Sequence, residues 1–460
     1  MSQHPAPVIG APPAKPEANR REQRKVAAAS MVGTTIEWYD FFIYANCAAL
    51  VFQGLFFGPV GKELGVLLSF ATIGLSFIFR PLGAIIAGHL GDKFGRKAVL
   101  VTTLLMMGIS TFLIGLLPTY EQIGITAPIL LIVLRILQGI SAGGEWGGAA
   151  LMSVEFAPKN KRGLFGSAPQ IATPIALILA SGVIGLMSVI APGDAFLAWG
   201  WRVPFMLSAI MVVVGLVVRR TIEESPVFTA MREASEGERV PLAALLRKFP
   251  LLVLVVALTF MANNGLGYMT AGGFIQKFAS DPEGPVALDR STVLFGIAIT
   301  AVFWLIGTLA GGWLSDRIGR RTTYFIGWAV LAVMVFPMFH MVSSGSIVQL
   351  VVGVSIFSVG LGLSYGPQSA FFAELFPSSV RYSGVSIAYA LGAILGGAFA
   401  PTIATALLQK YGSLNSVGVY LMIMVVISAA ATFLLRDRRG IELGHENEAE
   451  QSRGMFIFSK

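Results

Sequence analysis

The sequence predicts an all-α membrane protein with twelve transmembrane helices in two pseudo-symmetric six-helix bundles. Three observations predict this fold class. First, the 460 residues are 55% hydrophobic and 13% charged, with a mean hydropathy of +0.74, whereas soluble domains carry roughly 25% charged residues. Second, twelve stretches are long and apolar enough to cross a bilayer. Third, a set of glycine and charged residues recurs in both halves of the chain.

The twelve stretches set the domain organisation, because a spanning helix needs about 20 mostly apolar residues. The predicted spans are 27–56, 66–91, 98–118, 127–156, 164–191, 200–219, 250–279, 292–315, 322–341, 346–373, 383–408 and 415–435. The expected segments are a disordered cytoplasmic tail over 1–25, a six-helix bundle over 26–219, a cytoplasmic linker over 220–249, a second bundle over 250–436 and a cytoplasmic tail over 437–460. A signal peptide is not expected, because the first apolar run is too long for one.

Lysine and arginine set the orientation, since they collect in cytoplasmic loops. With both termini in the cytoplasm, 26 of the 33 lie on inside segments, and Arg80 and Arg135 lie within predicted spans. The outside loops hold only Lys62, Arg202, Lys277, Arg290 and Lys410. The net charge of +8 therefore reflects membrane orientation and predicts no nucleic-acid partner. The expected location is the plasma membrane, here the bacterial inner membrane, with both termini cytoplasmic.

Several functional classes lack support in the sequence. One cysteine, Cys47, leaves no disulfide, and the four histidines have no partner at ligand spacing, so neither a metal site nor a cofactor is expected. No P-loop, zinc-protease or serine-hydrolase motif is present. The chain is therefore not expected to be an enzyme.

An internal repeat relates the two halves. Gly83, Gly88, Asp92, Gly95 and Arg96 recur 224 positions later as Gly307, Gly312, Asp316, Gly319 and Arg320. A second pattern, Glu155-x-x-Pro-x-x-x-Arg162, recurs as Glu374-x-x-Pro-x-x-x-Arg381. Two six-span halves related by repetition indicate a transporter whose substrate site lies at mid-membrane between them.

The repeated motifs resemble a known superfamily. The segments 88–97 and 312–321 resemble the loop 2–3 signature of the major facilitator superfamily, which occurs in the same two places there. Finer features resemble its metabolite:proton symporter family: Glu37-Trp-Tyr-Asp-Phe41, Phe79-Arg-Pro-Leu-Gly83, Arg135-Ile-Leu-Gln-Gly139, Gly143-Gly-Glu-Trp-Gly-Gly148 and Trp199-Gly-Trp-Arg-Val-Pro-Phe205. The resemblance covers about residues 25 to 436.

The resemblance implies secondary active transport by alternating access. The expected function is proton-coupled uptake of a small organic acid or related metabolite, such as shikimate or a dicarboxylate. The partners are then the small-molecule substrate, protons and the lipid bilayer, and a monomer is the expected state. A proton-driven drug exporter or an uncoupled facilitator is the alternative within transport, and a transporter-like sensor is the alternative outside it. Two buried arginines favour an organic-acid substrate over an apolar drug.

The repeated charges are the candidate gate. In the family, the carboxylate at the position of Asp92 meets the cytoplasmic start of span eleven, where it opposes the positive end of the helix dipole. Arg96 is expected to reach Glu155, and Arg162 and Arg381 complete the cluster. The mirror set is Asp316, Arg320 and Glu374. These contacts are expected to close the cytoplasmic side. The alternative is that the charges only cap helices and set orientation.

Charges inside predicted spans are the candidate proton machinery, because such residues are costly there. The first half holds Glu37, Asp40, Arg80, Arg135 and Glu145. We expect Asp40 to exchange between Arg135 and a proton, with Glu37 as its rival, since a carboxyl group parted from an arginine in an apolar cavity takes up a proton. A static buried ion pair is the alternative. Glu145, in a glycine-rich stretch, is expected to be structural.

The candidate substrate site combines both halves. Arg80 can bind a carboxylate with two parallel contacts, unless it pairs with Glu145 or Glu37 instead. Gln138 and Gln170 are candidates for hydrogen bonds to substrate or for helix packing. The second half has no charge at the matching positions and offers neutral groups instead: Asn263, Asn264, Tyr268, Tyr365, Gln368 and Tyr389.

Overall fold

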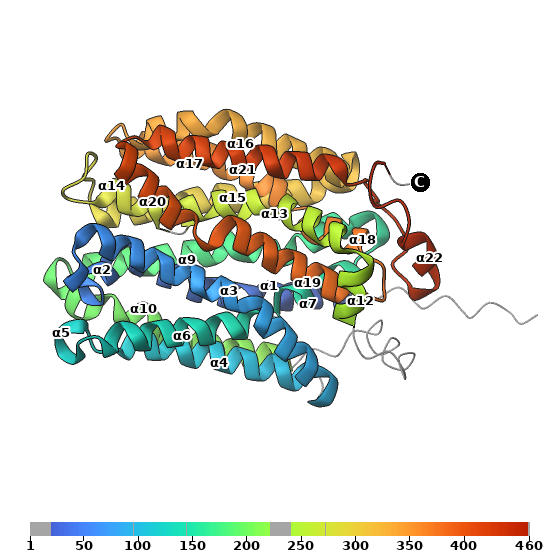
Figure 1. Ribbon diagram of the computed structural model, residues 1–460, viewed down its shortest axis with the longest axis horizontal. Coiled ribbons are helices and arrows are strands. Elements are labelled where there is room, and N and C mark those ends of the chain that lie inside the picture. The colour runs from blue at the N-terminus through green and yellow to red at the C-terminus, as the bar shows by residue number, and fades with distance from the viewer. Residues whose placement is uncertain (1–19, 95, 144, 221–240, 272, 459–460) are drawn as a thin grey trace, which may run out of the picture.

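The structure is a computed structural model that describes residues 20–94, 96–143, 145–220, 241–271 and 273–458. Long helices run roughly side by side, with the first half of the chain in the lower part of Figure 1 and the second half in the upper part. One end of the bundle carries α12 (Pro241–Lys248) and α22 (Glu448–Gln451). We call this end the inner end and the opposite end the outer end.

The first half contains six long helical runs within the described residues. They are α1 (Arg20–Cys47) with η1 (Ala48–Phe52) and α2 (Gln53–Leu55); α3 (Lys62–Phe94); α4 (Arg96–Leu116); α6 (Thr126–Ala142) with α7 (Glu145–Glu155); α8 (Arg162–Gly166) with α9 (Ala168–Ile190); and η4 (Phe196–Gly200) with α10 (Arg202–Arg220). Residues 20–25, expected to be disordered, are helical because Arg, Glu, Gln and Lys are strong helix formers.

The second half repeats this arrangement. Its runs are α13 (Pro250–Ala271) with α14 (Phe274–Ser280); α15 (Arg290–Ile318); α16 (Arg320–Val342); α17 (Ile347–Tyr365) with α18 (Gln368–Leu375); α19 (Arg381–Ala393) with η5 (Ile394–Ala398) and α20 (Ala400–Tyr411); and α21 (Leu414–Leu434). Each predicted span overlaps one helical run. The prediction of an all-α membrane fold is therefore confirmed.

The helical runs differ in hydropathy, and the run that begins with α1 lies at the centre of the protein. Ten runs in the described part of the chain are long and apolar enough to cross a membrane, and α4 contains a shorter apolar stretch, Val101–Leu116. The run that begins with α1 is more polar because it carries Thr34, Glu37 and Asp40, whose side chains are buried inside the protein. α1 is therefore a central helix whose polar groups contact other helices.

Glycines allow the closest helix contacts in the first half. A Cβ atom added to Gly83 of α3 would lie 1.9 Å from the Ile140 carbonyl oxygen, and one added to Gly139 of α6 would lie 2.2 Å from that of Ser76. Any larger residue would push the two backbones apart. The glycine stripes therefore fix the distance between α3 and α6, and thereby the position of Arg80 on α3.

The chain folds back on itself after α21. Leu435 forms an isolated antiparallel bridge with Phe456, and α22 lies between them at the inner end (Figure 1). We call residues 435–458 the C-terminal cap. The sequence indicated only a short tail here, because no hydrophobic period marks the cap.

Candidate functional site

A small cavity lies between the two halves near the middle of the bundle. Its volume is ≈ 20 Å³, which is room for about one water molecule. Helices α1, α9, α13, α15 and α17 supply its walls. The lining residues are Trp38, Phe42, Thr173, Phe260, Asn263, Asn264, Gly267, Tyr268, Trp304 and Tyr365. Both halves therefore enclose one mostly aromatic chamber.

Several polar groups around this chamber have no partner. Within the described residues, the Asn263 Nδ2, Asn264 Oδ1, Tyr268 Oη and Trp304 Nε1 atoms are buried without a hydrogen bond. Both polar side-chain atoms of Gln368 are in the same condition, although Gln368 does not line the cavity. Buried polar groups normally find partners. Unpaired groups gathered at one cavity therefore indicate a site that binds a polar ligand.

A buried ion pair lies directly behind the aromatic wall. The Nη2 atom of Arg80 is 3.2 Å from Oε1 of Glu37, and the two side chains are 2% and 0% exposed. The guanidinium carbon of Arg80 is 4.5 Å from the Phe41 ring centroid and 4.6 Å from that of Phe77. Phe77 in turn contacts Tyr268 of the cavity, with ring centroids 5.4 Å apart. Arg80 is thus one aromatic layer away from the cavity.

Asp40 and Arg135 are linked through two neutral side chains. Thr111 Oγ1 donates to Oδ2 of Asp40 at 2.8 Å, Gln138 Nε2 donates to Thr111 Oγ1 at 2.7 Å, and Arg135 Nη1 donates to Gln138 Oε1 at 2.7 Å. The guanidinium of Arg135 also lies 3.8 Å from the centroid of the Tyr44 ring. No direct ion pair joins Asp40 to Arg135 in the described residues, because Thr111 and Gln138 lie between them.

An aromatic stack joins the halves on the inner side of the cavity. Trp146 of α7 stacks on Tyr389 of α19 with ring centroids 3.7 Å apart and planes 9° apart. Tyr389 stacks in turn on the cavity residue Phe260, with centroids 4.6 Å apart. Gln170 Oε1 accepts a hydrogen bond from Trp146 Nε1 at 3.0 Å, while its Nε2 donates to the Tyr365 carbonyl at 3.4 Å. Gln170 and Tyr389 therefore bridge the halves.

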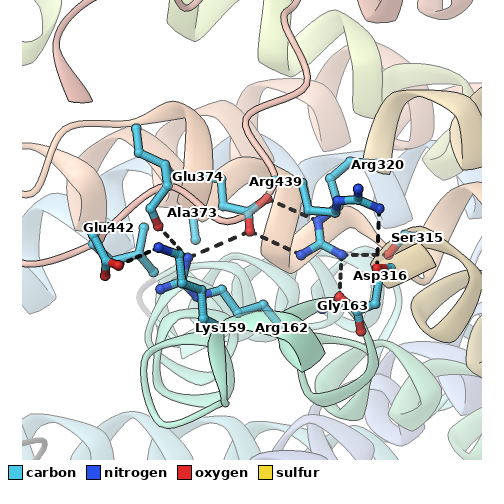
Figure 2. Close-up of polar contacts among 12 residues, drawn as sticks. Lys159, Arg162, Gly163, Ser315, Asp316, Arg320, Ala373, Glu374, Arg439 and Glu442 are labelled. Carbon is cyan, nitrogen blue, oxygen red and sulfur yellow. Dashed lines mark hydrogen bonds and ion pairs between the residues drawn. The ribbon is translucent and has the colours of Figure 1, made fainter. Parts of the chain in front are cut away.

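Repeated charges from the second half join the two halves at the inner end. Asp316 accepts hydrogen bonds at 2.8 Å from the backbone N–H groups of Gly163 and Leu164, at the start of α8. Arg320 donates to Asp316 at 2.6 Å and binds Glu374 through two parallel contacts of 3.0 Å. Figure 2 shows these side chains meeting between the halves. A carboxylate on helix N–H groups also opposes the helix dipole.

The mirror cluster is only partly described. Glu155 Oε1 lies 3.9 Å from Arg381 Nη1, and Arg162 Nη1 lies 3.9 Å from Glu374 Oε1. The shared spacing of the two repeats therefore brings each arginine to the carboxylate of the other half. The backbone of Asp92 and Arg96 is described, but their side chains are not among those that the structure describes.

The C-terminal cap covers both repeated arginines. Arg162 Nη1 donates to the Ile441 carbonyl at 2.5 Å. Arg381 donates to the Leu443 carbonyl and to Gln451 Oε1, both at 2.9 Å. The cap thus contacts the same position of the repeat in each half. These contacts could not be predicted from the sequence, because most of the acceptors are backbone carbonyls that leave no residue signature.

Gln451 anchors the cap. Its side chain is 1% exposed. Its Oε1 also accepts from the Ser378 backbone N–H at 2.7 Å, while its Nε2 donates to the carbonyls of Glu442 and Gly444 at 2.8 and 2.7 Å. One side chain therefore ties the cap together and joins it to the loop before α19.

Contacts also join the halves at the outer end. Lys62 of α3 forms ion pairs with Glu283 and, at 3.5 Å, with Asp281 in the segment after α14. Gln409 of α20 donates to the Glu63 carbonyl at 3.4 Å. The cavity is therefore shut off at both ends, which is an occluded arrangement.

The predicted substrate residues divide into two groups. Asn263, Asn264, Tyr268 and Tyr365 line the cavity. Arg80, Gln138, Gln170 and Tyr389 lie outside its lining, in the ion pair, the polar network and the stack, and Gln368 also lies outside it, with both polar side-chain atoms lacking a hydrogen bond among the described residues. Sequence reasoning missed Trp38, Thr173, Phe260 and Trp304 as lining residues, and Thr111 as a bridge. Trp304 had one signal, because it occupies the position of Arg80 in the repeat.

Glu145 and the residue types that bind metals provide no additional candidate site among the described residues. Glu145 is buried at the start of α7. Among the described residues, no group of three or more His, Cys, Asp or Glu side chains is placed to hold a metal ion. The polar chemistry of the molecule thus lies in the cavity, the two buried first-half networks and the clusters at the two ends.

Comparison with known proteins places the chain among transporters. The family model described as "Sugar (and other) transporter" matches residues 25–250, and that described as "Major Facilitator Superfamily" matches residues 285–457. The chain is 40% identical over 423 residues to the inner membrane metabolite transport protein YhjE of Escherichia coli, which covers 91% of this chain and 95% of that protein. It is 39% identical over 429 residues to the shikimate transporter of Escherichia coli, over 90% and 94% of the two chains.

A solved structure has the same fold. The proton:xylose symporter XylE, bound to 6-bromo-6-deoxy-D-glucose, aligns with a TM-score of 0.75 over 94% of this chain and 100% of that chain. Its sequence identity is 16%, so the likeness concerns the fold alone.

Proposed function

The chain belongs to the major facilitator superfamily of membrane transporters, and from that premise we propose that it takes up a small organic acid together with protons by alternating access. It is not an enzyme. The substrate class includes compounds such as shikimate or a dicarboxylate. The proposed location is the bacterial inner membrane, with the inner end in the cytoplasm and the protein acting as a monomer.

The observation that carries this proposal is the buried pair of Glu37 and Arg80, 3.2 Å apart behind the cavity wall. A guanidinium binds any carboxylate with the same planar fork. A substrate carboxylate that moves past Trp38 and Phe77 can therefore replace Glu37 on Arg80. Glu37 would then be left as a charge in an apolar site, which raises its affinity for a proton.

Charge balance makes this exchange a coupling device. The buried site contains one positive and one negative group before the exchange. With the substrate anion on Arg80 and a proton on Glu37, the net charge of the site is again zero. Losing one partner of a buried pair without replacement costs roughly 3–5 kcal/mol. The substrate and the proton are therefore expected to enter and leave together.

We propose Glu37 as the main coupling residue in place of Asp40. Asp40 accepts a hydrogen bond from the neutral Thr111 and makes no direct contact with Arg135 in the described residues. Substrate arrival would therefore displace no arginine from Asp40. We assign the Asp40–Thr111–Gln138–Arg135 network to holding α1, α4 and α6 together, and keep Asp40 as the alternative proton site.

Neutral groups of the second half would orient the substrate. Asn263, Asn264 and Tyr268 line the cavity and have buried polar atoms without a partner in the described residues. Hydroxyl or second carboxyl groups of the substrate can satisfy them. Because the cavity has only ≈ 20 Å³ in this occluded form, the aromatic walls must separate to admit any of these compounds.

Both ends must open in turn for transport. We propose that the Asp316, Arg320 and Glu374 cluster, its mirror set of Asp92, Arg96, Glu155, Arg162 and Arg381, and the C-terminal cap close the cytoplasmic side. The Lys62 ion pairs with Asp281 and Glu283 would close the opposite side.

Uptake by proteoliposomes tests the proposal. Wild-type protein is expected to accumulate radiolabelled shikimate or a dicarboxylate against its gradient when the outside is acidic, and a protonophore should abolish the accumulation. Glu37→Gln is expected to retain counterflow exchange and lose pH-driven accumulation. Glu63→Gln, an exposed acid-to-amide change at the outer end, is the matched control and should behave as wild type.

Two results would count against this mechanism. Normal pH-driven accumulation by Glu37→Gln, together with its loss in Asp40→Asn, would transfer coupling to Asp40. If the wild type takes up substrate only down the substrate gradient, and a pH gradient does not change the rate, the protein would be an uncoupled facilitator.

A further inference from the structure

An open groove lies on the surface of the C-terminal cap. Its volume is ≈ 680 Å³. Four guanidinium groups and one carboxylate, that of Glu450, are among its lining groups. We call this feature the arginine groove, after Arg436, Arg438, Arg439 and Arg453. A concave site with this excess of positive charge is suited to an anion.

Two of the arginines are held by the protein and shape the groove. Arg438 donates to the carbonyls of Gln451 and Glu450 at 2.7 and 2.8 Å. Arg439 Nη1 donates to the Arg317 carbonyl at 2.6 Å and to that of Asp316 at 3.3 Å. These bonds hold the guanidinium groups against neutral carbonyl oxygens, which do not cancel their charge.

The other two arginines are available to a ligand. Arg436 and Arg453 are exposed, and within the described residues their side chains make no hydrogen bond or ion pair. Burial lowers the pKa of Arg438, the Glu450 carboxylate opposes this shift, and the Arg436 guanidinium adds to it. The cations therefore repel one another, and an anion bound between them would relieve that repulsion.

The groove lies where a membrane helix ends. Arg436 follows α21 by two residues and donates its backbone N–H to the Met455 carbonyl at 2.9 Å, while Ile457 donates to the Leu434 carbonyl at 3.0 Å. This pairing returns Ile457 and Phe458 to the end of α21, where they are 37% and 64% exposed. Phe433, on the adjacent turn of α21, is 52% exposed. Apolar and aromatic side chains thus flank the groove.

We propose that the arginine groove binds the phosphate of an anionic phospholipid headgroup, with Ile457 and Phe458 inserted beside the acyl chains. Guanidinium groups recognise phosphate through paired hydrogen bonds. Basic clusters directly after a transmembrane helix attract anionic lipids, and aromatic residues favour the membrane interface. The proposal rests on the membrane placement of α21 and on no feature of the substrate cycle.

A soluble phosphate compound has the same anionic chemistry. The apolar pair distinguishes the two sources, since Ile457 and Phe458 have no role in binding a small hydrophilic anion. The lipid is therefore the source to which the geometry points.

Binding to the full-length protein in a neutral detergent tests the proposal without any transport assay. Phosphatidylglycerol, phosphatidylcholine, glycerol phosphate and inorganic phosphate would each be titrated, with the midpoint of thermal unfolding and native mass spectrometry as readouts. A bound ligand raises that midpoint by mass action. Phosphatidylglycerol is expected to stabilise the wild type saturably, whereas phosphatidylcholine and both soluble phosphates are expected to have little effect.

Two variants locate the site. Arg436→Gln combined with Arg453→Gln is expected to weaken phosphatidylglycerol binding on the order of tenfold or more. Arg247→Gln combined with Lys248→Gln is the matched control, because it removes two exposed charges at the same end, on α12, and should bind as wild type. Phe458→Ala should also weaken lipid binding, unlike Phe295→Ala on the exposed face of α15.

Three outcomes would overturn the proposal. Equal lipid binding by the groove variant and the wild type would place the lipid elsewhere. A full effect of glycerol phosphate or inorganic phosphate would make the groove a soluble-anion site. An equal loss of lipid binding in the α12 control would show that binding depends only on the net charge of the inner end.

Discussion

Trp146 and Tyr389 stack face to face across the two halves of the molecule, with ring centroids 3.7 Å apart. Trp146 belongs to α7 of the first half and Tyr389 to α19 of the second. This contact lies between the cavity residue Phe260 and the charged clusters of the inner end. It is therefore placed to separate the cavity from the inner end.

Trp146→Ala is predicted to loosen the inner closure. An aromatic pair contributes about 0.5–1.5 kcal/mol beyond its buried area, so the open population should rise roughly two- to tenfold. The measurement is the labelling rate of a cysteine introduced on the inner half of α19, in a Cys47→Ser background. Trp313→Ala, which removes an exposed tryptophan on α15, is the control. Equal labelling of both variants would show that the stack does not contribute to the inner closure.

Arg80→Lys is predicted to keep the fold and weaken substrate binding. A lysine retains the charge that pairs with Glu37 but loses the planar fork. The loss should be about 1.5–3 kcal/mol for a charge-assisted contact, or roughly 10- to 150-fold in Kd. Binding of the best carboxylate ligand by calorimetry measures it. Arg290→Lys, whose guanidinium also lies over a phenylalanine ring, at 5.1 Å, should bind normally. A best ligand without a carboxylate would contradict the role of Arg80.

Gly83→Ala is predicted to disrupt the first half, because the new Cβ atom would lie 1.9 Å from the Ile140 carbonyl oxygen. Backbone atoms cannot yield as a flexible side chain would. We expect a large fall in the yield of folded protein and in its unfolding temperature. Gly182→Ala is the control, since its Cβ would meet nothing within 4 Å. Similar stability of the two variants would show that α3 and α6 can separate freely.

Gln451→Ala is predicted to release the C-terminal cap. The change removes hydrogen bonds to Ser378, Arg381 and two cap carbonyls, and a buried group left unpaired costs about 1–3 kcal/mol. Limited proteolysis should cut after α21 faster than in the wild type. Gln349→Ala, at an exposed position in the first turn of α17, should leave the cutting rate unchanged. An equally resistant Gln451→Ala cap would mean that other contacts suffice.

The outer closure is predicted to persist in mild acid. Partial burial of Asp281 opposes its charge, but Lys277, hydrogen bonds and Lys62 outweigh this and hold the pKa of Asp281 below its usual value of 3.8. Its contribution to closure is therefore complete above that value and is lost as the pH falls through the lower pKa of the folded protein. Labelling of a cysteine near the outer end should be constant from about pH 7 to pH 5 and rise below about pH 4. Asp281→Asn should show no such rise.

Sequence reasoning placed much of this molecule correctly. Apolar runs predicted the helices, since a membrane imposes a minimum length on any spanning segment. The repeat predicted that Asp316 and Arg320 belong with Glu374, because the same residue types at the same spacing return to the same place in each half. The charges of α1 were identified as buried, since an acid within an apolar helix has few other places to lie.

Partner choice required the tertiary structure. Glu37 and Asp40 are three residues apart and share one face of α1, yet Glu37 reaches Arg80 and Asp40 reaches Thr111. Spacing along a helix determines depth and face, whereas the rotation of that helix against its neighbours determines which side chain it meets. The glycine contacts between α3 and α6, which position the helix of Arg80, involve backbone atoms.

The docking of the C-terminal cap likewise could not be predicted from the sequence. Its contacts to Arg162 and Arg381 are made largely by backbone carbonyls of Ile441 and Leu443. Every residue has such a carbonyl, so no pattern of side chains can reveal which ones will be used. Membrane burial and internal repetition depend on residue types, so both can be predicted from the sequence. The pairing of Glu37 with Arg80 and the docking of the cap depend on how rigid helices come to rest against one another, which only the folded chain decides.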